Sequence, residues 1–206
     1  GVLHDQQFMQ PDMDISINFP DGWNVVNTPI FVGAFAPDHQ ALIILGSAER
    51  PGSVAEIAAD FATELSSAEG LEAATTESVK LDIGPAYLVH LVDASAELPT
   101  SIYYMWINTR NTTLRFIATG ADSFRNQLRD GILSLRSMTS EEKASIANEC
   151  IRTIAANAGE SIQQLSARTG NLFSPEMTAA VNGLPDNTIL KQHQLIKILS
   201  REAYFR

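Results

Sequence analysis

The chain has 206 residues, enough for one large domain or for a medium-sized domain and a small one. Its 24 acidic and 14 basic residues give a net charge of −10, which argues against a general nucleic-acid binder. With 45% hydrophobic and 18% charged residues, the composition predicts a folded globular protein and excludes a disordered one. The longest apolar run, residues 41–45, is far shorter than the roughly 20 residues of a membrane-spanning helix.

The negative charge is concentrated in the first two thirds of the chain. Residues 1–139 contain 17 acidic and 7 basic residues, whereas residues 140–206 contain seven of each kind. A change of this size predicts two domains with different surfaces, and we place them at residues 10–138 and 139–206.

The first domain is predicted to consist mainly of strands joined by short turns. Residues 15–19 alternate apolar and polar side chains, and Pro20-Asp21-Gly22 leads from them into residues 23–26, which predicts a hairpin. Further strands are expected at residues 31–36, 41–46, 77–82, 86–92, 101–109 and 113–119, the last two joined by a turn at Asn111-Thr112. Strands joined by such short turns pair antiparallel.

Two helices are predicted within this domain. Ser53 and Glu56 form the capping-box pattern that opens a helix, and Asp122 is expected to cap the second. Each helix has one apolar stripe, so each must cover a sheet. We therefore predict an α+β fold in which an antiparallel sheet is flanked by helices.

An aromatic run, Tyr103-Tyr104-Met105-Trp106, lies inside one of the predicted strands. Alternation places Tyr103 and Met105 on one face of the sheet and Tyr104 and Trp106 on the other. We expect one pair to fill the core, while the other pair lies under a helix or lines a groove for a partner.

The second domain is predicted to be a small β-α-α-β unit preceded by a linker helix. The linker helix opens with a capping box at Thr139-Ser140-Glu141-Glu142. Between strands at residues 150–154 and 195–199, one helix is expected to begin near Ser161 and end at Gly170, and a second to end at Gly183. The inward face of the first helix is predicted to carry Ile162, Leu165 and Ala167.

This second domain resembles a LysM module. The resemblance is carried by Gly159-Glu160-Ser161-Ile162, by Asn182-Gly183-Leu184 and by residues 193–198, with Gln192-His193 in place of the family's Pro-Gly. It implies that two loops hold a glycan or a partner. The candidate contact residues are Gly159, Glu160, Ser161, Ile162, Lys191, Gln192 and His193.

The whole chain resembles the non-catalytic C-terminal region of bacterial CAAX-prenyl-protease-like zinc metallopeptidases with an HExxH motif. The segments that carry this resemblance are residues 17–23, 159–166 and 176–184. The Phe19-Pro20-Asp21-Gly22-Trp23 segment is also similar to PsbP-like domains. The resemblance implies a PsbP-like domain followed by a LysM-like domain, both accessory to a peptidase domain.

Catalytic patterns are sparse in the sequence. The four histidines, His4, His39, His90 and His193, are too far apart for an HExxH motif, so a zinc site is not expected in this chain. His90 is expected to pack in the sheet, and His193 is either a sugar contact or a solvated turn residue. Cys150 is either a small packed side chain or a nucleophile paired with His90 or His193. We predict no catalytic residue and no cofactor, with zinc only in a peptidase domain outside this sequence.

Two functions remain open at this point. The first is a non-catalytic accessory region of an exported zinc metallopeptidase, which positions a substrate or a protein partner for the catalytic domain of the same polypeptide. The second is a cell-wall module that binds peptidoglycan or N-acetylglucosamine chains. A weaker hypothesis is a small-molecule site in the first domain, which requires a convergent pocket. No export signal opens the sequence, but the resemblance implies a periplasmic or extracytoplasmic location.

Overall fold

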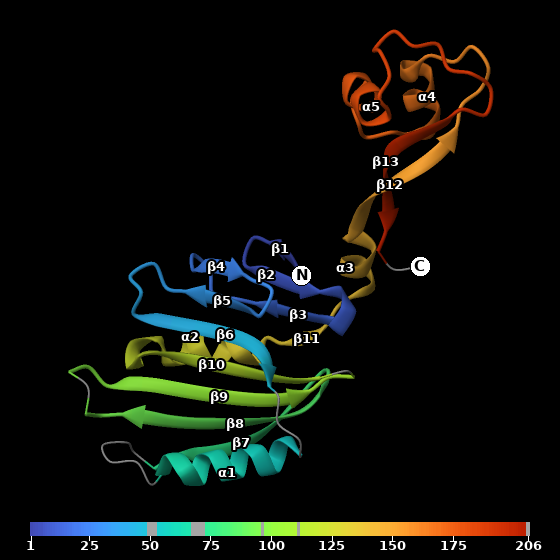
Figure 1. Ribbon diagram of the computed structural model, residues 1–206. Helices are drawn as coiled ribbons and strands as arrows, with labels where there is room; N and C mark the ends of the chain where they lie inside the picture. Colours follow the sequence, from blue (N-terminus) through green and yellow to red (C-terminus); the bar gives the residue numbers. More distant parts are fainter. Residues whose placement is uncertain (49–52, 67–72, 96, 111, 205–206) are drawn as a thin grey trace. The chain divides into compact units, whose positions relative to one another are not determined.

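The computed structural model describes residues 1–48, 53–66, 73–95, 97–110 and 112–204. It divides into two compact units, Gly1–Met138 and Thr139–Arg206, each with its own core (Figure 1). No helix among the described residues is long and apolar enough to cross a membrane. The predicted turn at Asn111-Thr112 includes Asn111, which lies outside the described residues.

The first unit is built on a seven-stranded sheet and a smaller four-stranded one, and all strand pairs among its described residues are antiparallel. The large sheet has the strand order β4(Asn24–Asn27), β5(Phe31–Phe35), β6(Ala41–Ala48), β10(Thr113–Ala121), β9(Thr100–Asn108), β8(Gly84–Asp93) and β7(Thr75–Leu81). The small sheet has the order β1(Val2–His4), β2(Gln7–Gln10), β3(Ile15–Asn18) and β11(Arg136–Ser137). A short 3₁₀ turn, η1(Pro11–Met13), connects β2 and β3.

Helices cover both faces of the large sheet. Helix α1(Val54–Ser66) packs on one face, where its apolar residues meet Val89 and Trp106. Helix α2(Arg125–Leu133) and the small sheet cover the other face, which carries the main core. The predicted α+β class, with antiparallel strands and flanking helices, is confirmed for this unit.

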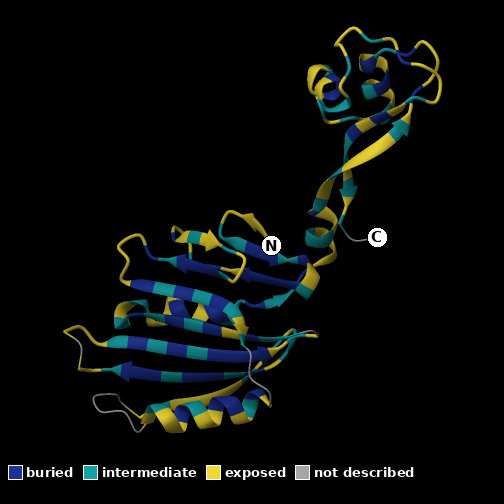
Figure 2. Ribbon diagram, in the orientation of Figure 1, coloured by how far each residue is buried: buried dark blue, intermediate teal, exposed yellow. Residues whose placement is uncertain are grey.

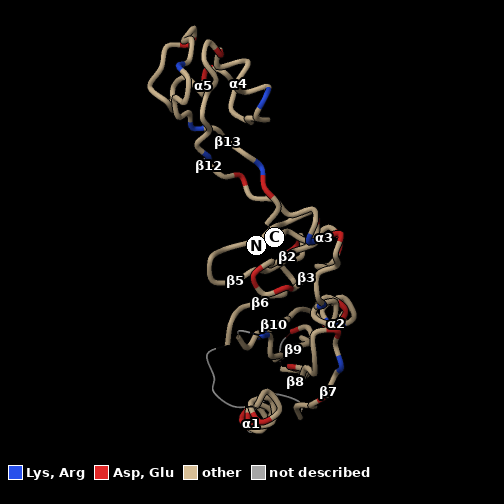
Figure 3. The backbone as a smooth tube through the Cα atoms, turned by 90° about the vertical axis from the view of Figure 1, so that its right-hand side faces the viewer, with Lys and Arg blue, Asp and Glu red and all other residues tan. Residues whose placement is uncertain are grey.

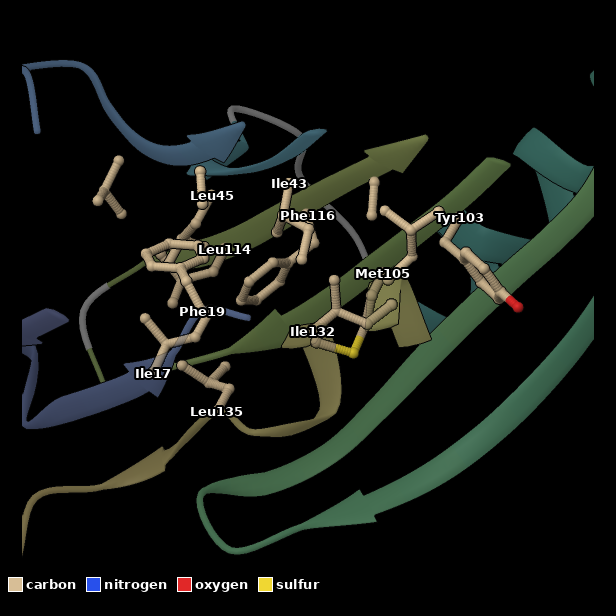
Figure 4. Packing of buried hydrophobic residues seen from close by; sticks show 14 of the residues in the cluster. Ile17, Phe19, Ile43, Leu45, Tyr103, Met105, Leu114, Phe116, Ile132 and Leu135 are labelled. Carbon is tan, nitrogen blue, oxygen red and sulfur yellow. The ribbon is translucent and has the colours of Figure 1, made fainter. Parts of the chain in front are cut away.

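The main core is formed by large apolar side chains from both sheets and α2 (Figure 4). Phe116, Met105 and Ile43 from the large sheet are completely buried, as are Ile17 from the small sheet and Ile132 from α2. Strands β6 and β10, and most of β9, alternate buried and less buried positions, so their apolar faces point into this layer.

The predicted hairpin at Pro20-Asp21-Gly22 is wrong. Strand β3 pairs with β2 and β11, whereas β4 pairs with β5 in the other sheet. Both edges of β3 are occupied, so none is left for β4. The turn instead carries the chain from one sheet to the other, with Phe19 and Trp23 buried on either side of it.

The predicted cap of the second helix is also wrong. Asp122 begins a 3₁₀ turn, η2(Asp122–Phe124), and makes no side-chain cap for α2, which begins at Arg125. Its carboxylate accepts hydrogen bonds from Ser101 Oγ at 2.5 Å and from Arg125 Nε at 2.8 Å. The Asp122 carboxylate, which the local sequence predicts to cap the backbone of the helix, is therefore bonded by side chains of β9 and α2 instead.

Gly120 of the large sheet has no room for a side chain. A Cβ atom at Gly120 would lie 2.8 Å from Ala41 Cα and 2.8 Å from the Gln40 carbonyl oxygen, both in rigid backbone of the neighbouring chain segment. At Gly46, in the same sheet, the nearest atom is the Ile30 carbonyl oxygen at 3.5 Å, an ordinary contact.

We expect Gly120→Ala to lower the free energy of unfolding by about 1–3 kcal/mol, because β10 must move away from β6. Gly46→Ala serves as the matched control and is expected to change stability little. Urea unfolding of the two variants measures the difference, and equal stabilities would contradict the steric argument.

The second unit has the order α3(Ser140–Ser145), β12(Ala147–Ala155), α4(Ile162–Thr169), α5(Pro175–Asn182) and β13(Leu195–Ala203). Strands β12 and β13 pair antiparallel over their full lengths, from Ala147 opposite Ala203 to Ala155 opposite Leu195. Its β-α-α-β order follows the predicted one, although both strands are longer than predicted.

Local capping signals set the helix ends of this unit. Thr139 and Glu142 form the predicted capping box of α3, and Ser161 forms another with Gln164 at α4. Gly170 and Gly183 end α4 and α5 in left-handed conformations. Helix α4 buries Ile162 and Leu165, but Ala167 is exposed, which corrects the predicted inward face.

Candidate functional site

The two loops that carry the candidate contact residues lie against each other in the second unit. The first loop joins β12 to α4 and the second joins α5 to β13. Gly159 N donates to the Leu190 carbonyl at 3.1 Å, Leu190 N donates to the Glu160 carbonyl at 2.8 Å, and His193 N donates to the Ala156 carbonyl at 2.9 Å. We call this surface, residues 156–161 and 189–194, the paired loops. All seven candidate residues lie in or directly beside it.

Glu160 holds the paired loops from within. Its side chain is 8% exposed, and its two carboxylate oxygens accept hydrogen bonds from Arg168 Nε at 2.8 Å and Nη2 at 2.9 Å. Asn157 N donates to the same carboxylate at 2.9 Å. These hydrogen bonds lower the pKa of Glu160 to about 2, and those from Arg168 have the largest effect. Its carboxylate therefore fastens the first loop to α4.

The other candidates divide into buried and exposed residues. Ile162 is 1% exposed and lies in the core of the unit, and Ser161 caps α4. Lys191, Gln192 and His193 are all exposed on the second loop. A ligand at the second loop can therefore reach three consecutive side chains, which carry an ammonium, an amide and an imidazole group.

Backbone geometry presents this run to solvent. His193 has φ 62° and Gly159 has φ 78°, so both loops turn tightly where they meet. Gln194 supports the second loop, because its Oε1 accepts a hydrogen bond from Lys191 N at 3.0 Å. The neighbouring Ile189 is 64% exposed and adds an apolar surface beside the polar run. Such a mixture of apolar and hydrogen-bonding groups suits a sugar ring or a peptide.

The remaining histidines lie in the first unit and Cys150 lies in the second. His90 stacks on Tyr103 at a ring-centroid distance of 4.3 Å, and Cys150 is a partly buried free thiol in β12. His4 and His39 are exposed in the first unit. In the part of the chain that the structure describes, no three His, Cys, Asp or Glu side chains gather as a metal would require.

The aromatic run divides between the two faces of the large sheet, as expected. Tyr103 and Met105 lie in the main core, and burial raises the pKa of the Tyr103 hydroxyl. Tyr104 and Trp106 lie under α1, where Phe61 contacts them at centroid distances of 4.6 and 5.1 Å. The side chains of this run therefore pack the large sheet against α1 on one face and against the main core on the other.

A polar network beside Tyr103 was not predicted. Ser101 is fully buried and donates to Asp122, and this hydrogen bond is the main cause of the lowered pKa of that carboxyl group. Arg129 Nη2 donates to both carboxylate oxygens of Glu77, at 2.9 and 3.0 Å. These contacts tie η2 and α2 to the strands beneath them.

The first unit also contains a cavity of about 220 Å³ where its two sheets meet. This volume exceeds that of an engineered apolar cavity of roughly 150 Å³ that accommodates benzene. None of its described lining side chains is charged: apolar groups include Phe8, Ile15, Val32 and Leu45, and polar ones include Gln10, Thr28 and Ser47. The sequence did not predict this cavity, because the predicted hairpin places β3 and β4 in one sheet whereas they lie in two.

Comparisons with known proteins find likeness among solved structures only. No protein-family model matches the chain, and no curated protein matches it. The cyanobacterial PsbP (CyanoP) from Synechocystis sp. PCC 6803 is 13% identical with a TM-score of 0.49, covering 67% of this chain and 96% of that one. LpqN, involved in cell envelope biogenesis of Mycobacterium tuberculosis, is 14% identical with a TM-score of 0.46, covering 61% and 83%.

A third similar structure comes from Bacteroides thetaiotaomicron. It is 15% identical with a TM-score of 0.46, and the match covers 71% of this chain and 53% of that one. At these identities the likeness concerns the fold alone.

Proposed function

We propose that this chain is a non-catalytic accessory region of an exported zinc metallopeptidase, which binds a substrate or partner for the catalytic domain of the same polypeptide. The support comes from the paired loops, a surface held by backbone hydrogen bonds and by the Glu160–Arg168 contact. Its three exposed polar side chains suit binding. Zinc belongs to the peptidase domain in this proposal, and the location is periplasmic or extracytoplasmic.

Two measurements test the peptidase context. We expect the coding sequence upstream of residue 1 to contain a helix with an HExxH motif, the spacing that places two histidines and a general base on one helix face. We also expect the purified chain with added Zn²⁺ to leave unfolded casein intact. An upstream sequence without such a helix would refute the accessory role, as would zinc-dependent casein cleavage by this chain alone.

The second candidate function is a LysM-like module that binds N-acetylglucosamine chains of the cell wall. The specific observation in its favour is the adjacency of the two loops, because the resemblance places glycan contacts there. Lys191 and Gln192 supply donors for hydroxyl and acetamide oxygens, and Ile189 supplies an apolar contact for a sugar face.

The glycan hypothesis predicts that the chain is retained on insoluble peptidoglycan or chitin. Lys191→Ala combined with Gln192→Ala removes two contacts without touching the core, and we expect about tenfold less retention, the equivalent of one hydrogen bond to a charged group. Lys197→Ala is the control, an exposed lysine in the middle of β13. Full recovery of the unmodified chain in the flow-through would remove this function.

A further inference from the structure

The two-stranded ribbon of the second unit has one closed edge and one open edge. On the outer edge of β13, Asn182 Oδ1 accepts from Lys197 N at 2.8 Å and Asn182 Nδ2 donates to the Lys197 carbonyl at 2.9 Å. Asn171 Oδ1 accepts from Leu199 N at 2.9 Å, and Leu172 N donates to the Leu199 carbonyl at 2.9 Å. Side chains and a loop thus complete the ladder that a third strand would otherwise make.

The register identifies which residues of β12 face the other way. Ala156 N donates to the Gln194 carbonyl at 2.9 Å, and in an antiparallel pair this bonding alternates along the strand. Ile154, Arg152 and Cys150 therefore bond to β13. Thr153, Ile151 and Glu149 turn their N–H and C=O groups to the outer edge of β12.

That outer edge is open over these three residues. At its end the Ala155 carbonyl accepts from Arg168 Nη2 at 3.3 Å, but no described residue makes a hydrogen bond to the backbone groups of Glu149, Ile151 or Thr153. All three residues are exposed, and the length of β12 is mostly exposed in Figure 2. An edge of this kind is a template for another strand.

The side chains along the edge are partly apolar. Ile151 is 59% exposed and lies on the same face of the ribbon as Leu195, which is 68% exposed. Residues of both charges also occur along the ribbon (Figure 3), and Arg152 is paired with Glu202 at 2.6 Å. A strand added to β12 would cover Ile151 without breaking that ion pair.

We propose that the open edge of β12 binds an extended polypeptide segment as a third, antiparallel strand, with an apolar residue of the segment opposite Ile151. This inference rests on the proposed function, in which the chain binds a polypeptide substrate or partner, and it names the conformation in which that polypeptide is held. Main-chain hydrogen bonds supply the affinity, and the Ile151 contact supplies selectivity.

The spacing of the unpaired backbone N–H and C=O groups on the outer edge of β12 favours an extended polypeptide as the ligand. One N–H donor and one C=O acceptor face outward at each of Thr153, Ile151 and Glu149. These pairs of groups repeat at intervals of about 6.8 Å, which is the rise of two residues in a strand. An extended main chain repeats the complementary donors and acceptors at the same interval, so every group is paired at once.

The probe is a fluorescein-labelled nine-residue peptide with Val at alternate positions and Thr or Glu between them, titrated into the whole chain by fluorescence anisotropy. In an antiparallel ladder, the residues opposite Thr153, Ile151 and Glu149 direct their N–H groups at β12. We therefore expect N-methylation of the Val amides to abolish binding and N-methylation of the intervening amides to spare it. Equal binding by both methylated peptides would overturn strand addition.

Thr153→Pro tests the protein side of the ladder. The Thr153 N–H points outward, so proline removes an edge donor and leaves the bonds between β12 and β13 in place. We expect the Kd for the unmethylated peptide to rise about tenfold or more, whereas Thr153→Ala, which keeps the N–H, leaves it within about twofold. Unchanged affinity in Thr153→Pro, with a native circular dichroism spectrum, would refute the proposal.

Ile151→Lys tests whether Ile151 makes the apolar contact with the peptide. It also tests the alternative that the edge of β12 binds a second copy of the chain. We expect this variant to weaken peptide binding, with the unmodified chain monomeric in analytical ultracentrifugation. A dimer that Ile151→Lys dissociates would assign the edge to self-association and overturn the polypeptide site. Peptide binding with no HExxH helix encoded upstream of residue 1 would refute the accessory role while leaving the strand-addition site standing.

Discussion

Replacing Glu160 with Gln is expected to loosen the paired loops and to remove a pH dependence from the stability of the second unit. The pKa of Glu160 is lowered from 4.5 to about 2, chiefly by its hydrogen bonds from Arg168. The ionised carboxylate therefore contributes stability that is fully present above about pH 4.5 and is lost as the pH falls toward 2. In Glu160→Gln this acid-sensitive contribution is absent, and the unit is less stable at neutral pH.

Amide resonances of the second unit report this difference. Thermal unfolding followed by two-dimensional NMR at pH 7, 4 and 2.5 should give a falling midpoint for the unmodified chain and a lower, flatter profile for Glu160→Gln. Asp186→Asn is the matched control, because Asp186 is exposed in the same unit. If Glu160→Gln kept the acid sensitivity of the unmodified chain, the Glu160–Arg168 contact would not be its source.

Trp106→Ala is expected to destabilise the first unit by about 3–5 kcal/mol, the usual cost of removing a buried aromatic side chain. Trp106 is 2% exposed and lies under α1, in edge contact with Phe61. Its loss leaves a cavity between α1 and the sheet. The variant retains Trp23, whose fluorescence then follows unfolding in urea.

Tyr104→Phe is the control for this substitution, since it keeps the ring that contacts Phe61 and removes only the hydroxyl group. We expect its stability to stay within about 0.5 kcal/mol of the unmodified chain. The alternative role predicted for one pair of this aromatic run is to line a groove for a partner. Trp106→Ala with unchanged stability would favour that alternative and contradict the packing assignment.

Arg168 connects the paired loops with the ribbon edge at which the polypeptide is proposed to bind. Asn171 and Asn182 satisfy the backbone of β13, while Arg168, which holds Glu160, also reaches the end of β12. One arginine thus links the first of the paired loops to the strand with the open edge. Stability of the loops and peptide binding at β12 are therefore expected to respond together to changes at Arg168.

Local signals in the sequence predicted the helices of the second unit well. The capping box at Thr139 and the glycines at 170 and 183 act through residues within one helical turn, so neighbouring positions suffice to identify them. The same holds for Ser53 and Glu56, whose reciprocal hydrogen bonds open α1. The antiparallel α+β class also followed from short turns and one-sided helices.

Choices between distant partners were not predictable in this way. Asp122 bonds to Ser101, 21 residues earlier, instead of capping its own helix. The Glu160 carboxylate bonds to Arg168, one helix away, a partner that the sequence did not predict. The paired loops were predicted only through resemblance, and the cavity between the sheets was missed.

Most helices and the strands of the large sheet were predictable from the sequence, as were the acidic first part and the near-neutral second part, because periodicity, capping and charge are properties of neighbouring residues. Strands β1, β2 and β11 of the small sheet were not predicted. Tertiary structure alone decided that β3 and β4 lie in different sheets, that asparagines close one edge of the ribbon, and that β12 keeps its edge open. The physical reason is that a backbone donor or carboxylate has several acceptable partners, and the packing of the whole unit selects one of them.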